Sequence, residues 1–213
     1  MFDLIVFDMD GVLVDSEPIA NRILHRHLCT LGLPMTLPEF MKACVGLSTP
    51  SWRALIRDLH GIEVPEALLA AQRAELDEAY RAELQAIAGV EAVIQAVDKP
   101  RCVASGSSPT RIALSLRLTK LDRYFGPNVF SSTMVERGKP HPDLFLHACK
   151  TMGHDPRRAA VIEDSLPGVT AGVAAGMKVF AYAGADYADA DALAKAGGEV
   201  FTDMRDLPKL LGV

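Results

Sequence analysis

The sequence has no excess of basic residues. Its 22 Lys and Arg residues are outnumbered by 27 Asp and Glu residues, which gives a formal net charge of -5 at pH 7. Nucleic acids and anionic membranes attract basic surfaces, so the composition gives no electrostatic reason to expect either as a partner. Any anionic substrate must therefore be bound by a few positive groups placed close to it.

The sequence also begins without a long hydrophobic run. The opening segment MFDLIVFDMDG is interrupted by Asp3 and Asp8 and has no basic lead, which argues against a signal peptide or a membrane span there. The cysteines are few and far apart, with no CxxC pair: Cys29, Cys44, Cys102 and Cys149. We therefore expect reduced thiols in a cytoplasmic protein, and nothing in the sequence requires more than a monomer.

What the sequence does contain is enough apolar residues, 49% of 213, to build a substantial core. Short apolar runs, typical of buried strands, alternate with stretches of helical periodicity. The runs are FDLIVF before Asp8, RCVA before Ser105, NVFS around Val129, AAVI before Glu163 and KVFAY around Val179, and the helical stretches start near Pro109, Pro142 and Pro167. This alternation predicts an α/β fold with a parallel sheet covered by helices on both faces.

One long interval, between Asp15 and about Gln85, breaks the alternation. It contains helical periodicity but no convincing strand, as in EPIANRILHRHLCTLG, SWRALIRDLHG and PEALLAAQRAELDEAYRAEL. Glycines and prolines separate these stretches from one another. We predict a core domain of residues 1–15 and 86–213 and an inserted four-helix cap domain of residues 16–85.

Ligands of open parallel sheets bind beyond the carboxyl ends of the strands, so the polar residues that follow the apolar runs are the candidates for a site. Asp8 closes the first run and Asp10 follows it. A DxD pair is often only a solvated turn, but two half-buried carboxylates need a cation or a shared proton, and magnesium suits oxygen ligands. Ser105 and Gly106 precede a helix start, which could bind an anion or could be a simple helix cap.

Two further segments carry charge close to predicted strand ends. Lys139 lies before a Pro-x-Pro turn, and the flanking Pro140 and Pro142 stiffen the loop that carries its ammonium group. An exposed lysine is usually only surface charge, but here it could serve as a counter-ion to phosphate or carboxylate. Glu163 and Asp164 end the run AAVI, where they could favour a helix dipole or supply cation ligands.

The four segments in this order resemble the motifs of the haloacid dehalogenase superfamily, specifically its helical-cap phosphatases and the similar β-phosphoglucomutases. DMDGVLVDSE is similar to the first motif, Ser105 to the second, Lys139 to the third, and Glu163 with Asp164 to the fourth. The resemblance covers essentially the whole chain. It implies a Rossmann-like core with the first strand central, flanked by the strands that carry Ser105 and Glu163.

The resemblance also implies a role for each residue. Asp8 would be the nucleophile that forms an aspartyl phosphate, and Asp10 the general acid that then acts as base toward water. Mg2+ would be held by an Asp8 oxygen, the Asp10 backbone carbonyl and Asp164, with Glu163 a direct or water-mediated ligand. The phosphoryl oxygens would be bound by three groups: Ser105, the Gly106 amide and Lys139. The resemblance further implies a small phosphorylated metabolite, such as a sugar or sugar-acid phosphate, as the substrate.

Three alternatives remain open. A phosphosugar mutase of the β-phosphoglucomutase type shares this chemistry, but its cap histidine and arginine correspond here to Ala20 and Thr49, which favours water as the acceptor; neighbouring Asn21 and Arg53 leave that alignment open. Haloacid dehalogenases lack an acidic residue at the position of Asp10. A non-catalytic phospho-acceptor module needs no cap. We therefore expect a magnesium-dependent phosphatase.

Overall fold

The computed structural model describes residues 2–47 and 49–212. The chain divides into two compact units, Met1–Asp15 with Gln85–Val213, and Ser16–Leu84. Gln85, which the sequence pattern places in the insertion, groups with the first unit, and its carbonyl oxygen accepts a hydrogen bond from the Asp15 amide at 2.9 Å. The second unit thus interrupts the first between two chain positions that lie side by side.

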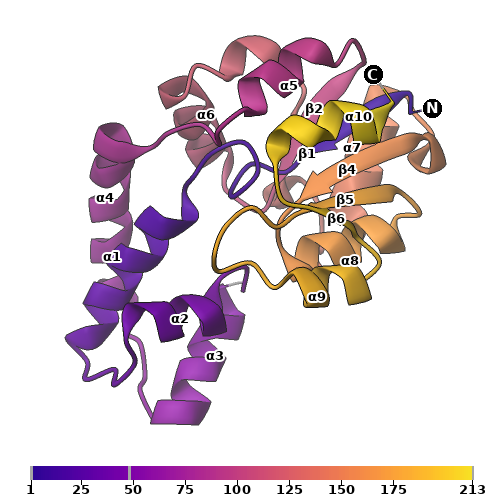
Figure 1. The fold of residues 1–213 in the computed structure, drawn as a ribbon. Helices are drawn as coiled ribbons and strands as arrows, with labels where there is room; N and C mark the ends of the chain where they lie inside the picture. The colour runs from indigo at the N-terminus through magenta and orange to yellow at the C-terminus, as the bar shows by residue number, and fades with distance from the viewer. Residues whose placement is uncertain (1, 48, 213) are drawn as a thin grey trace. The chain divides into compact units, whose positions relative to one another are not determined.

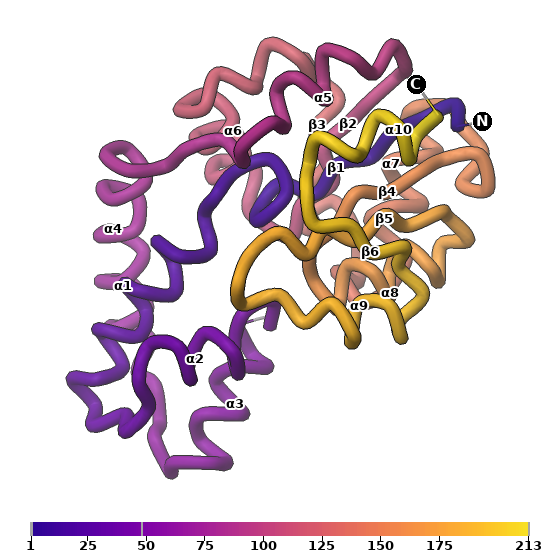
Figure 2. The backbone as a smooth tube through the Cα atoms, viewed as in Figure 1, coloured from indigo at the N-terminus to yellow at the C-terminus, as the bar shows by residue number. Residues whose placement is uncertain are grey.

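The first unit is built on a six-stranded parallel sheet with the order β3-β2-β1-β4-β5-β6. The strands are β1 (Leu4–Phe7), β2 (Arg101–Ser105), β3 (Val129–Ser131), β4 (Ala159–Glu163), β5 (Lys178–Tyr182) and β6 (Glu199–Phe201). The first strand lies inside the sheet between β2 and β4, as the resemblance implied, and Figure 2 shows β1 beside these distant parts of the chain. The sequence did not predict β6, a three-residue edge strand that starts at the exposed Glu199.

Helices cover both faces of this sheet, which gives the predicted α/β architecture. They are α5 (Val90–Ala96), α6 (Pro109–Leu118), α7 (Asp143–Met152), α8 (Leu166–Ala174), α9 (Ala190–Lys195) and α10 (Leu207–Leu211). Figure 1 shows α5 and α10 on one side of the strands and α8 and α9 on the other. Strands β1 and β4 are buried along their whole length, because each packs beneath helices on both sides.

The second unit consists, in its described part, of four helices: α1 (Glu17–Cys29), α2 (Leu37–Cys44), α3 (Thr49–His60) and α4 (Glu66–Glu83). This is the predicted four-helix insertion. Its own hydrophobic core includes Leu28, Phe40, Ile56 and Leu69. A capping box between Thr36 and Glu39 starts α2, with the Glu39 carboxylate 2.8 Å from the Thr36 amide.

The register of the sheet determines which strand ends meet. Phe7 lies opposite Ile162 of β4 and Val103 of β2, so the residues that follow these three on their strands are neighbours at one edge. All strands are parallel, and their carboxyl ends therefore share this edge. The last residue of β4 is Glu163, and the residue after β1 is Asp8. The sheet thus places two acidic side chains on adjacent strands at one edge.

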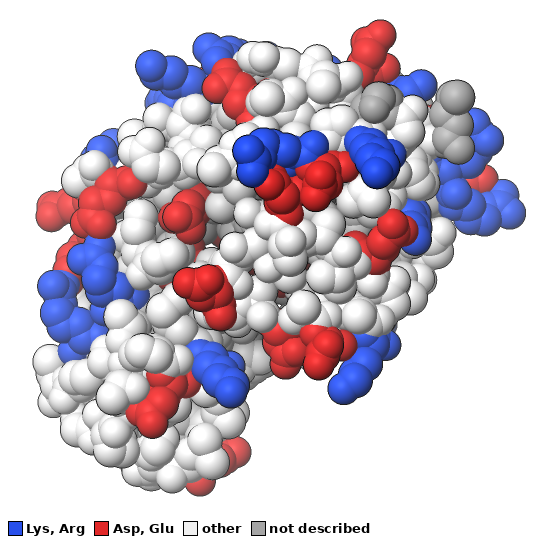
Figure 3. Space-filling view, viewed as in Figure 1, with Lys and Arg blue, Asp and Glu red and all other residues white. Residues whose placement is uncertain are grey.

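Two surface features bear on possible partners. On the face shown in Figure 3, acidic and basic side chains are interspersed, and no broad basic area is visible. Within residues 2–47 and 49–212, no helix is both long enough and apolar enough to cross a membrane.

Candidate active site

The centre of the acidic edge is an ion-pair triad of Asp8, Lys139 and Glu163. The Lys139 ammonium lies 2.5 Å from Asp8 Oδ1 and 2.5 Å from Glu163 Oε1. Glu163 is completely buried, and only 10% of the Lys139 side chain is exposed. Lys139 also lies over the ring of Phe145, 5.0 Å from its centroid. The loop between β3 and α7 thus delivers the cation that balances two carboxylates on neighbouring strands.

The Glu163 carboxylate is fully engaged by donors of this chain. Oε1 accepts from Lys139, while Oε2 accepts from the Asp164 amide, the Ser165 amide and the Ser165 hydroxyl, each at 2.9 Å. Charge-assisted hydrogen bonds of this kind hold a carboxylate strongly. Glu163 therefore fixes both the position of Lys139 and the turn that presents Asp164.

Burial acts in opposite directions on the pKa values of Asp8 and Lys139. Burial raises the pKa of Asp8 to about 8; the Lys139 charge opposes this rise, and the Glu163 and Asp10 charges add to it. Burial would lower the pKa of Lys139, but the Asp8 and Glu163 carboxylates outweigh it, so this pKa lies above its ordinary value. Lys139 is therefore charged at neutral pH, and a further cation beside Asp8 would favour the ionised carboxylate.

A third carboxylate completes a set of oxygen donors suitable for a metal. One carboxylate oxygen each from Asp8, Glu163 and Asp164 lies within 4.8 Å of the other two. When Asp8 is ionised, three carboxylates face one ammonium, which leaves net negative charge in a half-buried site, and hard cations such as Mg2+ prefer carboxylate oxygens. The donor chemistry of this edge therefore fits the magnesium expected from the sequence.

Two glycines allow the acidic side chains to lie where they do. A Cβ atom on Gly11 would come 1.8 Å from Asp164 Oδ2, and a Cβ atom on Gly168 would come 1.8 Å from Glu163 Oε1. Gly11 also has a φ of 76°, which L side chains rarely adopt. The backbone of these two residues thus forms part of the wall around the carboxylates.

Gly168→Ala is expected to lower the free energy of unfolding by about 1–3 kcal/mol, because the new methyl group overlaps a buried carboxylate that cannot move without losing Lys139. Urea unfolding of the variant measures this loss. Gly138→Ala is the matched control, since its methyl group would meet only Ser132 Cβ, at 3.6 Å. Equal stability of the Gly168 and Gly138 variants would show that the residues around the Glu163 carboxylate can move to accept the added methyl group.

The second predicted segment forms a braced loop after β2. Ser105 is buried at the strand end, and its hydroxyl accepts a hydrogen bond from the Ser107 amide at 3.0 Å. Ser132 donates to the Gly106 carbonyl at 2.7 Å, and Ser131 donates to the Ser107 carbonyl at 2.7 Å. The loop that carries Ser105 and Gly106 is therefore held by the end of β3 as well as by its own strand.

A side chain that sequence reasoning overlooked links this loop to the first motif. The Ser107 hydroxyl donates to Asp10 Oδ2 at 2.8 Å, across 97 residues of sequence. The structure thus brings Asp8, Lys139, Glu163 and Asp164 into one cluster and connects Asp10 to the Ser105 loop. No pattern in the sequence distinguishes Ser107 from the serines beside it, so this contact could not have been found there.

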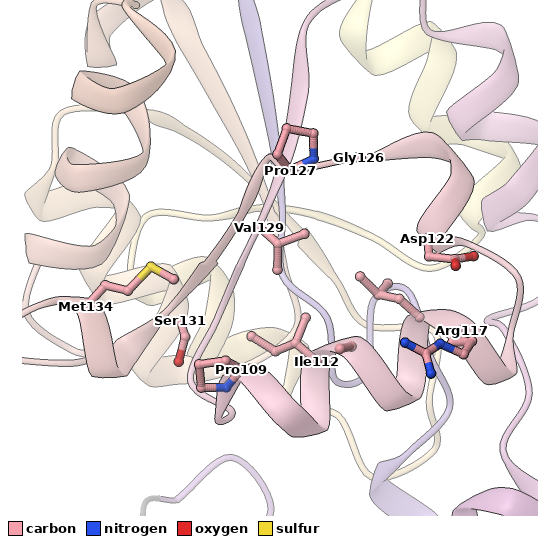
Figure 4. Close-up of a pocket in the computed structure, with 11 residues that line it drawn as sticks. Pro109, Ile112, Arg117, Asp122, Gly126, Pro127, Val129, Ser131 and Met134 are labelled. Carbon is pink, nitrogen blue, oxygen red and sulfur yellow. The ribbon is translucent and has the colours of Figure 1, made fainter.

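A separate, largely apolar pocket of about 330 Å3 lies between α6 and β3. Figure 4 shows Ile112 and Val129 in its middle and Arg117 with Asp122 at one end. None of the seven candidate residues lines it. Its lining is largely apolar, so it offers few charged groups to bind a charged ligand.

Comparison with known proteins identifies the family. A model of the family described as haloacid dehalogenase-like hydrolase matches residues 2–176. The chain belongs to the haloacid dehalogenase-like hydrolases. Among curated relatives of this hydrolase is the 6-phosphogluconate phosphatase of Escherichia coli (strain K12), which is 30% identical over 179 residues; the match covers 84% of this chain and 81% of the relative.

Two solved structures resemble this hydrolase over nearly its entire length. A conserved haloacid dehalogenase-like protein of Agrobacterium tumefaciens is 35% identical, with a TM-score of 0.92 over 100% of this chain and 98% of the other. A family hydrolase of Deinococcus radiodurans, solved with bound phosphate and sodium, is 31% identical, with a TM-score of 0.84 over 99% and 95% of the two chains. The family's hydrolase fold therefore extends through the whole chain, including the inserted unit.

Proposed function

We propose that this hydrolase is a magnesium-dependent phosphomonoesterase that acts on a small phosphorylated metabolite through an aspartyl-phosphate intermediate. The observation that carries the proposal is the buried cluster of Asp8, Lys139 and Glu163 beside Asp164, which combines a candidate nucleophile with the charges that phosphoryl transfer requires. A relative named as a phosphatase and a similar structure with bound phosphate support the same chemistry.

Asp8, the Asp10 backbone carbonyl and Asp164 are the residues that would hold Mg2+. Glu163 would be a direct ligand or a ligand through a water molecule, and the four hydrogen bonds that its oxygens already accept favour the water-mediated arrangement. When bound, the ion supplies positive charge that offsets the repulsion between a carboxylate and a phosphate dianion. Lys139 adds a second positive charge at the same place.

In the first half-reaction, an Asp8 carboxylate oxygen forms a bond to phosphorus while the bond from phosphorus to the ester oxygen breaks. The electron pair of that bond stays on the departing oxygen, which takes the proton of Asp10 and leaves as an alcohol. In the second, water gives a proton to Asp10 and its oxygen forms a bond to phosphorus, while the bond from phosphorus to the Asp8 oxygen breaks. The electron pair of that bond restores the Asp8 carboxylate, and inorganic phosphate leaves. Ser105, the Gly106 amide and Lys139 bind the phosphoryl oxygens throughout.

The substrate is proposed to be a sugar phosphate or a sugar-acid phosphate, by analogy with the Escherichia coli relative. A phosphosugar mutase is the second candidate, because it would use the same carboxylates. Ala20 and Thr49, at the positions of the mutase histidine and arginine, favour water over a sugar hydroxyl as acceptor. The presence of Asp10 argues against halide displacement, in which no leaving oxygen needs a proton.

We further propose that the enzyme works as a monomer in the cytoplasm.

Release of inorganic phosphate from a panel of phosphorylated metabolites tests the proposal. We expect turnover of sugar or sugar-acid phosphates in the presence of Mg2+, its loss on addition of EDTA, and its return when excess Mg2+ is added. Turnover that persists in EDTA would exclude the metal-dependent mechanism. In a parallel reaction with bisphosphorylated glucose and a glucose phosphate, isomerisation faster than phosphate release would favour the mutase instead.

A further inference from the structure

The hydrogen bond between Ser107 and Asp10 joins the loop after β2 to the proposed general acid. The hydroxyl donates to Oδ2 at 2.8 Å, a normal length for a bond to a carboxylate. We infer that Ser107 is a positioning residue, which sets the orientation of the Asp10 carboxyl group for proton transfer to the leaving oxygen. This inference rests on the proposed phosphatase function and adds a residue to it.

Ser107 can serve this purpose because its own backbone is held on both sides. Its amide donates to the buried Ser105 hydroxyl at 3.0 Å, and its carbonyl accepts from the Ser131 hydroxyl at 2.7 Å. Ser105 and Ser131 are register partners at the ends of β2 and β3, and both are buried. With its backbone fixed by two strand ends, Ser107 has little freedom left except rotation of its short side chain.

The neighbouring peptide is fixed in the same way. Ser132 donates to the Gly106 carbonyl at 2.7 Å, so adjacent residues after β3 hold adjacent carbonyls of the loop. Proton transfer requires the donor to lie within hydrogen-bond reach of the leaving oxygen in a narrow range of directions. A chain of contacts from β3 through Ser107 thus gives Asp10 a rigid support that lies outside its own turn.

The inference predicts a dependence on the leaving group. An alkyl leaving group departs as a strongly basic alkoxide and needs the Asp10 proton, whereas a dinitrophenolate is stable without one. A misaligned general acid should therefore slow hydrolysis of an alkyl phosphate much more than hydrolysis of 2,4-dinitrophenyl phosphate. Loss of a phosphate-binding group would slow both substrates alike, because both transfer the same phosphoryl group.

The test compares the parent enzyme with Ser107→Ala on these two substrates. For a sugar phosphate that the parent hydrolyses, we expect kcat to fall about 10- to 100-fold with KM nearly unchanged, as for partial loss of general-acid catalysis. For 2,4-dinitrophenyl phosphate, kcat should change much less. Ser107→Thr, which keeps the hydroxyl, should restore most of the sugar-phosphate rate. Ser131→Ala should show the same pattern in weaker form.

Thr110→Ala is the matched control, because it removes an exposed hydroxyl three residues away that contacts Ser108 rather than Asp10. Thermal unfolding establishes that each variant is folded. Equal losses on both substrates, or no loss on either, would overturn the role of Ser107 and leave the phosphatase proposal standing. A parent enzyme without turnover of either substrate would overturn both.

Discussion

Replacement of Asp8 by Asn is expected to lower turnover of any phosphate ester by a factor on the order of 10^4 to 10^6, as removal of an essential nucleophile does. The amide has nearly the shape of the carboxylate but cannot attack phosphorus. Steady-state release of phosphate measures the loss. Asp3→Asn is the matched control, since Asp3 precedes the same strand and pairs with Arg158 at the surface.

The Asp8→Asn variant should lose activity without losing its fold. Because burial raises the pKa of Asp8 to about 8, folding favours the protonated form, and ionisation of Asp8 lowers stability as the pH rises from about 4 to about 8. A neutral side chain avoids that loss. In metal-free buffer at pH 8, the variant should therefore unfold at the same temperature as the parent or higher, and substantial residual turnover would remove Asp8 as the nucleophile.

Lys139→Met is expected to lower the free energy of unfolding by about 3–5 kcal/mol at pH 8 in metal-free buffer, because it leaves the carboxylates of Asp8 and Glu163 without their cation. Removal of the Lys139 charge raises the pKa of Asp8 further, so at low pH Asp8 is protonated and no longer repels the Glu163 carboxylate. The difference in free energy of unfolding between the variant and the parent should thus be smaller at pH 5 than at pH 8. Chemical unfolding at the two pH values measures it.

Lys178→Met is the control for this prediction. Lys178 also pairs with a glutamate, Glu199, at 2.7 Å, but both side chains are 45% exposed. A surface pair of this kind contributes less than about 1 kcal/mol. If the two lysine variants lose similar amounts of stability, or if the Lys139 deficit is independent of pH, then the buried triad is not the source of the effect.

The sheet could be predicted from the sequence because its central strands are continuous runs of apolar residues. Runs such as AAVI are buried on both faces and therefore consist of apolar residues, and the first polar residue after each run marks a strand end. Asp8, Ser105 and Glu163 could be located in this way from the residues alone. The edge strand β6 could not, because three residues starting with an exposed Glu199 lack such a run.

The contacts of individual side chains were less predictable. Lys139 could be named as a counter-ion, but its bonds to both Asp8 and Glu163 depend on how the loop after β3 folds back over the sheet. The hydrogen bond from Ser107 to Asp10 is even harder to predict from the sequence. Three serines occur within four residues, and only the backbone geometry determines which of them reaches Asp10. Roles in the reaction for all these residues remain predictions.

The junction at Asp15 and Gln85 has a consequence for how such an enzyme can evolve. The Asp15 amide bonds to the Gln85 carbonyl, and the Ile87 amide bonds to the Leu13 carbonyl at 3.0 Å, so the two ends of the interruption lie side by side. A segment whose two ends lie side by side can be replaced by another while the rest of the chain keeps its fold, as in domain insertion. Gene fragments that encode residues 16–84 can thus be exchanged between relatives, while the strands and the carboxylate cluster of the first unit stay unchanged.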